Sequence, residues 1–230
     1  MSGKPKKTLI LPNKTSAAAI ISRLPYSKKY NAEEVFDQAQ KVDLKGLISL
    51  SIPMHLESPG NGLKLISQLC EMGLHLVAVV SWHRDRHIVA SRSKRLTNAW
   101  EPIAIFSRSK DWFIDRDGPS RPKRGAAGRE EQFDEDEFLT CVGDHWPIRC
   151  DRRDRRLLPA QVILNLIQLS GLGKGDTILD PWGNPTVKEQ CETLGLKYSD
   201  SGLENTLRDD WSKKKKKNKA ETTDEEDEDS

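Results

Sequence analysis

Residues 178–200, ILDPWGNPTVKEQCETLGLKYSD, constrain the fold more than any other stretch of the chain. They are typical of a strand, a tight turn, a helix and a second strand, the unit that builds a parallel α/β sheet. When such a unit holds a nucleotide-like cofactor, its turn is usually glycine-rich so that the backbone can approach the ligand. This turn has one glycine, Gly183, and a proline, Pro185. The stretch therefore predicts an α/β fold and leaves open whether the turn still holds a cofactor.

Strand and helix patterns alternate along most of the remaining chain. Apolar, β-branched runs predict strands within residues 8–12, 44–54, 74–83, 100–108 and 173–180, the run at 74–83 being a central strand. Helical patterns, the first of them alanine-rich, occupy residues 13–24, 61–73 and 157–171. We expect one Rossmann-like, doubly wound α/β domain with a mostly parallel sheet over residues 1–211.

Two segments differ from this domain in composition. Residues 107–145 are rich in charge, proline and glycine, and they predict a long polar insertion. Residues 212–230 are lysine-rich and then acidic, which predicts a disordered tail that could serve a homodimer or a protein partner. The chain has no apolar run of about 18 residues and no signal-peptide pattern. We expect no membrane contact and a cytoplasmic location, in a bacterial or virus-infected host cell.

The charges nearly cancel, with 37 Lys and Arg against 35 Asp and Glu, but they are segregated along the chain. Basic clusters of this kind can track the phosphates of DNA. The candidate DNA-binding residues are Arg84, Arg86, Arg92, Lys94, Arg95, Arg121, Lys123 and Arg124. A solvated surface balanced by nearby acids is the alternative, and the DRRDRR run at 151–156 can be paired internally. The histidines and cysteines of HRDRH and CVGDHWPIRC lack a recurrent metal-ligand spacing, so we expect no metal.

Three stretches, taken in order, resemble the β-group of S-adenosylmethionine-dependent DNA amino-methyltransferases, which methylate adenine N6 or cytosine N4. GLISLSIPM resembles the catalytic strand with its Asp/Asn/Ser-Pro-Pro-aromatic tetrapeptide. The stretch from VVSWH to IFSRS resembles the tryptophan- and glutamate-bearing strands. The stretch from LLPAQ to KYSD resembles the cofactor unit with its Asp-Pro-Phe-x-Gly-x-Gly signature. A catalytic motif that precedes the cofactor motif distinguishes this group, and the resemblance spans about residues 45–205.

The resemblance implies a catalytic tetrapeptide at Ser51, Ile52, Pro53 and Met54. The Ser51 side chain and the Ile52 carbonyl would accept hydrogen bonds from the amine of a flipped base, and Met54 stands where the family stacks an aromatic ring. A serine slightly favours cytosine N4 over adenine N6. The alternative for Ser51 is a hydroxyl at a strand end with no catalytic role.

The resemblance also implies an S-adenosylmethionine site. By position, Asp180, Trp182 and Gly183 would lie beside the cofactor, and Asp200, or else Glu204, would bind its ribose hydroxyls. Asp180 could instead cap the turn after its strand, and Trp182 could instead pack in the core. Likewise, Glu101 could be an ion-pair partner of the RSKR segment at 92–95.

The motifs depart from the family at positions that matter chemically. Pro185 or Thr186 replaces the second glycine of the cofactor turn, and proline fixes φ and removes an N–H donor. An unrelated nucleotide-binding α/β protein would leave the order of the three matched stretches unexplained, so two hypotheses come before it. The first is an active DNA methyltransferase, and the alternative is a catalytically inactive protein of the same fold that acts as a DNA- or protein-binding module.

Overall fold

A computed structural model gives the architecture of the chain. The residues that it describes are 16–26, 29–54, 60–88, 98–115, 120–122, 139–141, 143–151, 153–154 and 156–203. Within these ranges, residues 85–88, 98–99, 120–122 and 139–141 are described by their backbone alone. The predicted strand at 8–12, the tail at 212–230 and Glu204 lie outside the described residues.

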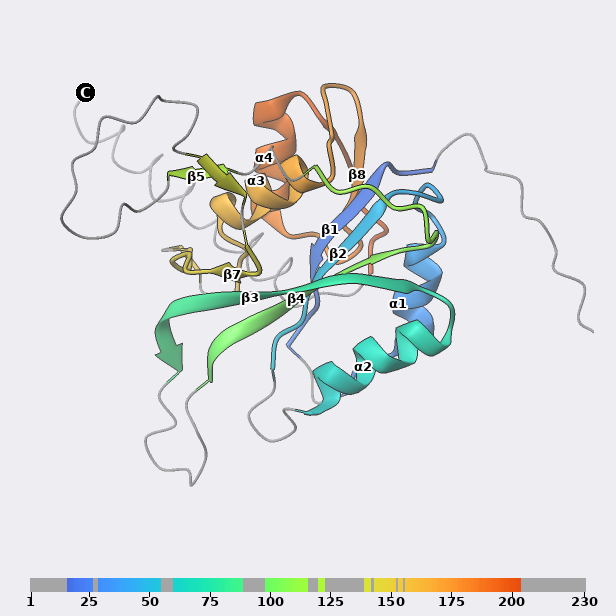
Figure 1. The fold of residues 1–230 in the computed structure, drawn as a ribbon, viewed down its shortest axis with the longest axis horizontal. Helices are drawn as coiled ribbons and strands as arrows, with labels where there is room; N and C mark the ends of the chain where they lie inside the picture. Colours follow the sequence, from blue (N-terminus) through green and yellow to red (C-terminus); the bar gives the residue numbers. More distant parts are fainter. Residues whose placement is uncertain are drawn as a thin grey trace, which may run out of the picture.

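A seven-stranded sheet in the order β7-β3-β4-β2-β1-β8-β9 forms the middle layer (Figure 1). The strands are β1 (Ala19–Arg23), β2 (Leu47–Ser51), β3 (His75–Ile88), β4 (Asn98–Ser107), β7 (His145–Trp146), β8 (Thr177–Leu179) and β9 (Lys197–Ser199). Only β4 runs against the others, because it pairs antiparallel with both β2 and β3 while every other pairing in the sheet is parallel. The prediction of a mostly parallel α/β sheet is confirmed.

Helices cover both faces of the sheet. Helices α1 (Ala32–Ala39) and α2 (Gly60–Glu71) pack on one face, with Val35 and Leu69 against Ile20 of β1 and Phe106 of β4. Helices α3 (Ala160–Leu169) and α4 (Pro185–Leu194) pack on the opposite face, over Ile21 and the middle strands. The neighbouring side chains Ile20 and Ile21 thus point into different halves of the core. This three-layer, doubly wound arrangement is the predicted one.

The helix predicted at 13–24 is wrong. Its described residues, 16–24, contain strand β1, and all five residues of that strand are buried. Its alanines and isoleucines suggested a helix, but β1 lies between β2 and β8 and is covered by helices on both faces. Such a strand is apolar throughout and shows no alternation, so the tertiary context overrides the local propensity.

The run at 74–83 is a strand, as predicted, but not a central one. It belongs to β3, which lies second from the sheet edge, and the edge strand β7 pairs with it only at Ser81 and Trp82. In the predicted insertion, β5 (Ser120–Pro122) and β6 (Leu139–Cys141) form a separate two-stranded sheet. Among the described residues, no helix is long and apolar enough to cross a membrane.

Candidate functional site

The turn after β8 is organised by the carboxylate of Asp180, which has no exposed surface. It accepts hydrogen bonds from the Ser22 hydroxyl on β1, the backbone N–H of Asn184 and, at 3.3 Å, the Tyr198 hydroxyl on β9. Burial raises the pKa of Asp180 to about 7, and the nearby charge of Asp200 acts in the same direction, while the three hydrogen bonds oppose the shift. Asp180 therefore joins β1, β8, β9 and the turn, in agreement with the turn-capping alternative.

The turn itself starts α4 without strain. Gly183 has φ = 68°, a conformation that glycine adopts at no steric cost. The Asn184 side chain then caps α4 by accepting from the Thr186 N–H at 3.1 Å. Pro185 occupies the first helical position, where a missing N–H leaves no hydrogen bond unmade. The replacement of the family's second glycine is thus compatible with a regular helix start at this place.

The Asn184 side chain also has a buried donor without a hydrogen-bond partner. The side chain is buried, with 1% of its surface exposed, and its Nδ2 group has no hydrogen-bond partner, the one such buried side-chain atom among the described residues. A buried donor without an acceptor is destabilising by about 1–3 kcal/mol. An acceptor atom of a ligand would remove that penalty, so the start of α4 is a place where a ligand can be held.

The other predicted cofactor residues take different positions. Trp182 is buried and packs with Leu24 and Leu179 in the core beneath α1 and α2, which agrees with the core-packing alternative. Asp200 follows β9 at the surface, where its Oδ1 accepts from the Gly202 N–H at 2.6 Å. The described residues thus place an acid and a helix start at the carboxyl ends of two neighbouring strands, where ligands bind in open α/β sheets.

The predicted tetrapeptide lies at the end of β2, and β1 separates it from β8. Ser51 is buried and donates its hydroxyl hydrogen to Glu101. The Ile52 N–H donates to the Pro102 carbonyl at 2.9 Å, and the Pro53 carbonyl accepts from the Tyr30 hydroxyl at 2.5 Å. Several polar groups of this segment are therefore already bonded within the protein.

Ser51 belongs to a buried ion cluster formed by Arg23, Glu101 and Arg84. Arg23 makes a bidentate pair with Glu101, with Nε to Oε1 at 2.7 Å and Nη2 to Oε2 at 2.6 Å. Arg84 approaches the same carboxylate at 3.4 Å and lies over the ring of Trp82, 5.4 Å from its centroid. All three charged residues are no more than 6% exposed.

The cluster holds Glu101 in its charged form. Burial alone would raise the pKa of Glu101, but Arg23, then Arg84 and Ser51, lower it below its usual value. Sequence reasoning anticipated that Glu101 is an ion-pair partner, but its partners are Arg23 and Arg84, whereas the RSKR segment lies outside the described residues. Arg23 was missed because its segment was predicted to be a helix. The apolar run before Arg23 was the available signal that the segment is a buried strand.

The structure describes only part of the predicted DNA-binding set. Arg84 is in the ion cluster, and its Nε also donates to the Cys150 thiol at 3.3 Å. Arg86 and Arg121 are described by their backbone alone, in β3 and β5. The remaining candidates lie outside the described residues: Arg92, Lys94, Arg95, Lys123 and Arg124. In the DRRDRR run, Arg153 pairs with Asp151 and Arg156 with Asp154, so the expected internal pairing is confirmed for these residues.

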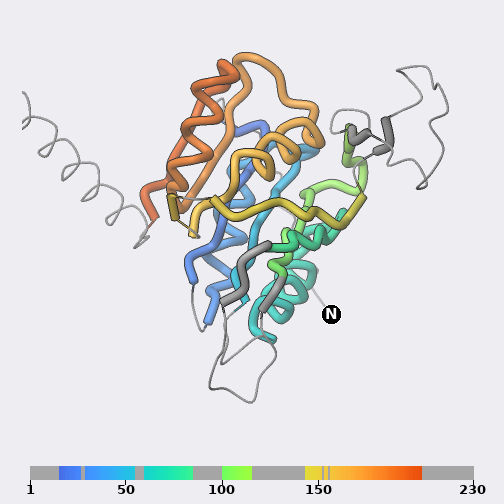
Figure 2. The backbone as a smooth tube through the Cα atoms, turned by 90° about the vertical axis from the view of Figure 1, so that its left-hand side faces the viewer, coloured from blue at the N-terminus to red at the C-terminus, as the bar shows by residue number. Residues whose placement is uncertain are grey.

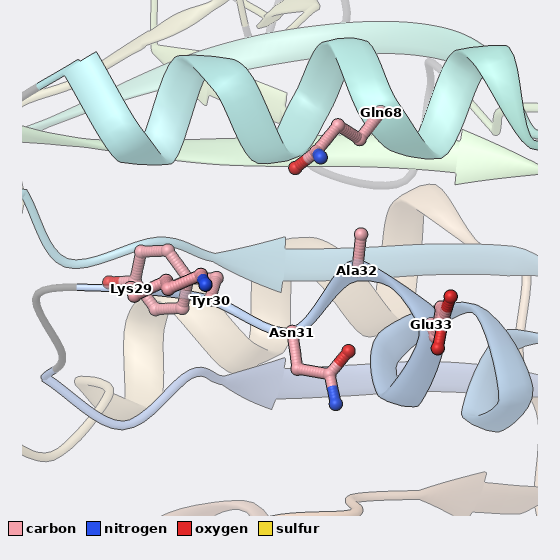
Figure 3. Close-up of a pocket in the computed structure, with 6 residues that line it drawn as sticks. All are labelled: Lys29, Tyr30, Asn31, Ala32, Glu33 and Gln68. Atoms are coloured by element: carbon pink, nitrogen blue, oxygen red, sulfur yellow. The ribbon is translucent and has the colours of Figure 1, made fainter.

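A separate cavity of about 490 Å³ opens on the face that carries α1 and α2. Figure 3 shows Lys29, Tyr30 and Asn31 on the segment before α1, and Gln68 reaching toward them from α2. Of the predicted site residues that the structure describes, none lines this cavity. Tyr30 connects the two regions, since its hydroxyl binds the Pro53 carbonyl.

The chain is similar to known proteins in its fold, as solved structures show. No protein-family model and no curated protein matches the chain. Solved structures do match. The PvuII DNA methyltransferase (cytosine-N4-specific) aligns with a TM-score of 0.56 and 13% identity over 81% of this chain and 74% of its own. M1.HpyAVI in its complex with S-adenosylmethionine gives 0.54 and 15% over 80% and 81%.

A third match is TTHA0409 from Thermus thermophilus, a putative DNA modification methylase complexed with S-adenosyl-L-methionine, with a TM-score of 0.53, 12% identity and coverage of 83% and 81%. The chain has the methyltransferase fold of these structures. The methyltransferase fold covers about four-fifths of the chain, so the resemblance extends well beyond the three matched stretches. At this level of identity the shared feature is the backbone arrangement, and the function must be argued from the site.

Proposed function

We propose that this chain is a DNA methyltransferase-like protein that binds S-adenosylmethionine at β8, α4 and β9 but does not transfer its methyl group through Ser51–Met54. This corresponds to the catalytically inactive alternative, with the cofactor place kept. The observation that carries the proposal is the contrast between two places at the same edge of the sheet, after the carboxyl ends of β8 and β2. The Asn184 amide lacks a partner, whereas the Ser51 hydroxyl is bonded to Glu101, a carboxylate that Arg23 and Arg84 hold in its charged form.

The residues after β8 and β9 fit the cofactor chemically. The unpartnered Nδ2 of Asn184 can donate to an acceptor atom of S-adenosylmethionine, and Gly183 lets the backbone approach it. The Asp200 carboxylate, at the surface after β9, can accept from the ribose hydroxyls. In this reading Asp180 and Trp182 support the turn from beneath. When bound, S-adenosylmethionine would supply an electrophilic methyl group.

Amine methylation requires an acceptor that orients the nitrogen and receives its proton. The Ser51 oxygen keeps acceptor lone pairs, but its hydroxyl is bonded to Glu101, and Arg23 and Arg84 lower the pKa of that carboxyl, which makes it a poor acceptor for the proton of the amine. The strand next to β8 ends in Arg23, a cation that cannot accept a proton. We infer that the described ends of β1 and β2 serve the structure of the protein and not methyl transfer.

DNA is the proposed partner. The names of the structural neighbours and the basic stretches of the sequence support it. We assign the phosphate contacts to Arg86, Arg92, Lys94, Arg95, Arg121, Lys123 and Arg124. We leave out Arg84, because its guanidinium is buried in the ion cluster. Binding should weaken steeply with salt, as expected when phosphates are neutralised and counterions released.

Isothermal titration with S-adenosylmethionine tests the cofactor assignment. Asn184→Ser keeps an oxygen that can cap α4 but removes the amide donor. We expect the wild type to bind and Asn184→Ser to bind about 2- to 10-fold more weakly, the range for one lost hydrogen bond. Glu192→Gln, on the exposed side of α4, is the control and should bind like the wild type. Wild-type protein that is folded and gives no heat with millimolar ligand would refute the assignment.

A further inference from the structure

The segment between β7 and α3 runs from the side of β3 to the carboxyl end of β1; we call its described residues, 147–151, 153–154 and 156–158, the strap. At one end, the Trp82 Nε1 on β3 donates to the Ile148 carbonyl at 2.8 Å. Further along, an Arg23 guanidinium nitrogen at the end of β1 donates to the Arg156 carbonyl. In the view of Figure 2 this yellow segment passes in front of the blue strands β1 and β2. The strap thus lies at the carboxyl end of β1, the strand that pairs with β8.

The strap is also attached to α4 through Arg153. Its Nη1 donates to both carboxylate oxygens of Glu189, at 3.0 and 2.9 Å, and its Nη2 approaches the Thr186 hydroxyl at 3.3 Å. The backbone N–H of Thr186 is the group that Asn184 caps. Arg153 therefore contacts the first turns of α4, and one of its partners, Thr186, is two residues along the chain from Asn184 with its unpartnered amide.

These attachments differ in strength. The hydrogen bonds from Trp82 and Arg23 start from side chains that are buried. The Arg153 and Glu189 side chains are 43% and 42% exposed, so water and salt screen their attraction. The contact between the strap and α4 is accordingly the first that would open, while the two buried attachments hold the strap near the sheet.

We propose that the strap gates the cofactor place and that the Arg153–Glu189 pair is its latch. With the strap closed, the Asn184 amide is buried and lacks an acceptor; when the latch opens, a ligand can reach the start of α4. This inference rests on the proposed S-adenosylmethionine site. Because the ligand binds only the open state, apparent affinity falls with the open fraction. An exposed ion pair changes that fraction by about 1.4- to 5-fold.

The test compares two substitutions that each remove one negative charge from α4. Glu189→Gln removes the carboxylate that binds Arg153, and Glu192→Gln removes one that pairs with Lys188 on the same helix. We expect Glu189→Gln to tighten S-adenosylmethionine binding by about 1.4- to 5-fold. We also expect faster hydrogen exchange of strap amides in that variant without ligand. Glu192→Gln should match the wild type in both measurements.

Arg153→Gln opens the same latch from the other side and provides a second variant if Glu189→Gln is poorly folded. Wild-type binding with an unchanged dissociation constant in both latch variants would overturn the gate and leave the cofactor site intact. If neither the wild type nor any variant binds S-adenosylmethionine, the proposed function fails, and the gate fails with it. Altered exchange with no effect on binding would likewise overturn the gate, since it would show an attachment without a role in ligand access.

Discussion

At the scale of single residues, Asp180 makes the stability of the protein depend on pH. Its pKa of about 7 in the folded protein lies above the usual 3.8. Between these two pH values, the Asp180 carboxyl therefore keeps its proton in the folded protein and loses it in the unfolded chain. Its contribution to the free energy of unfolding is therefore greatest below pH 4 and falls as the pH rises toward and through 7. Asp180→Asn should remove this dependence and make the protein more stable than wild type at pH 8.

Urea unfolding at several pH values between 4 and 8 measures this difference. The control is Asp176→Asn, because Asp176 is an exposed carboxylate just before β8. The gap between Asp180→Asn and the wild type should widen with rising pH, whereas Asp176→Asn should run parallel to the wild type. Identical pH profiles for Asp180→Asn and the wild type would contradict the assigned burial of a titrating carboxylate.

Glu101 is the residue on which the ion cluster depends. Glu101→Gln would leave Arg23 and Arg84 buried without their shared carboxylate, and removal of one partner of a buried pair typically costs about 3–5 kcal/mol. Ser51→Ala removes only one hydrogen bond to the charged Glu101, and we expect a loss of about 1.5–3 kcal/mol. Equilibrium unfolding in urea distinguishes the two. A Glu101→Gln variant as stable as Ser51→Ala would show that the cluster is not a structural unit.

The sequence alone predicted some of these residue roles and missed others. It identified Glu101 as an ion-pair partner and Asp180 as a residue that could cap the turn. It did not identify Arg23, although Arg23 is the direct sheet neighbour of Ser51. A buried ion pair between residues 78 positions apart depends on strand order, which no local pattern contains.

At the scale of elements, the turn between α1 and β2 packs through Gly46 against Ala18, the residue just before β1. A Cβ atom there would meet the Ala18 carbonyl oxygen at 2.3 Å, which is backbone and cannot rotate away. Gly46→Ala should therefore destabilise the protein by about 1–3 kcal/mol. Gly60→Ala is the matched control, because that position opens α2 and has no atom within 4 Å. Thermal unfolding of both variants measures the difference, and equal melting temperatures would contradict the packing described.

Helices and strands were predicted correctly where an element buries only one of its sides, because its apolar residues then recur with a clear period. Helix α2 shows helical spacing because it packs on the sheet with one side, and β8, α4 and β9 were recognised as one unit. The pattern failed at β1, whose residues Ile20 and Ile21 are both buried, one on each face. A strand covered on both sides has no polar face to indicate its period, so alanine content decided the prediction wrongly.

At the scale of the whole molecule, the order of the sequence motifs was enough to predict the fold, and the solved methyltransferases confirm it. Their identities of 12–15% with this chain show how far side chains can change on one backbone arrangement. The tetrapeptide was assigned to β2 from local similarity alone. The sheet order places β1 and its Arg23 between that segment and the cofactor unit, a relation that sequence spacing could not give.

The most direct test of the proposed function is a transfer assay under saturating cofactor. Protein in excess over DNA is incubated with methyl-labelled S-adenosylmethionine, and the DNA is digested and its nucleosides are measured by mass spectrometry, beside a Ser51→Ala sample. We expect the protein to retain the cofactor while the DNA acquires neither N4-methylcytosine nor N6-methyladenine. Labelled cytosine or adenine that disappears with Ser51→Ala would contradict the account and establish an active methyltransferase.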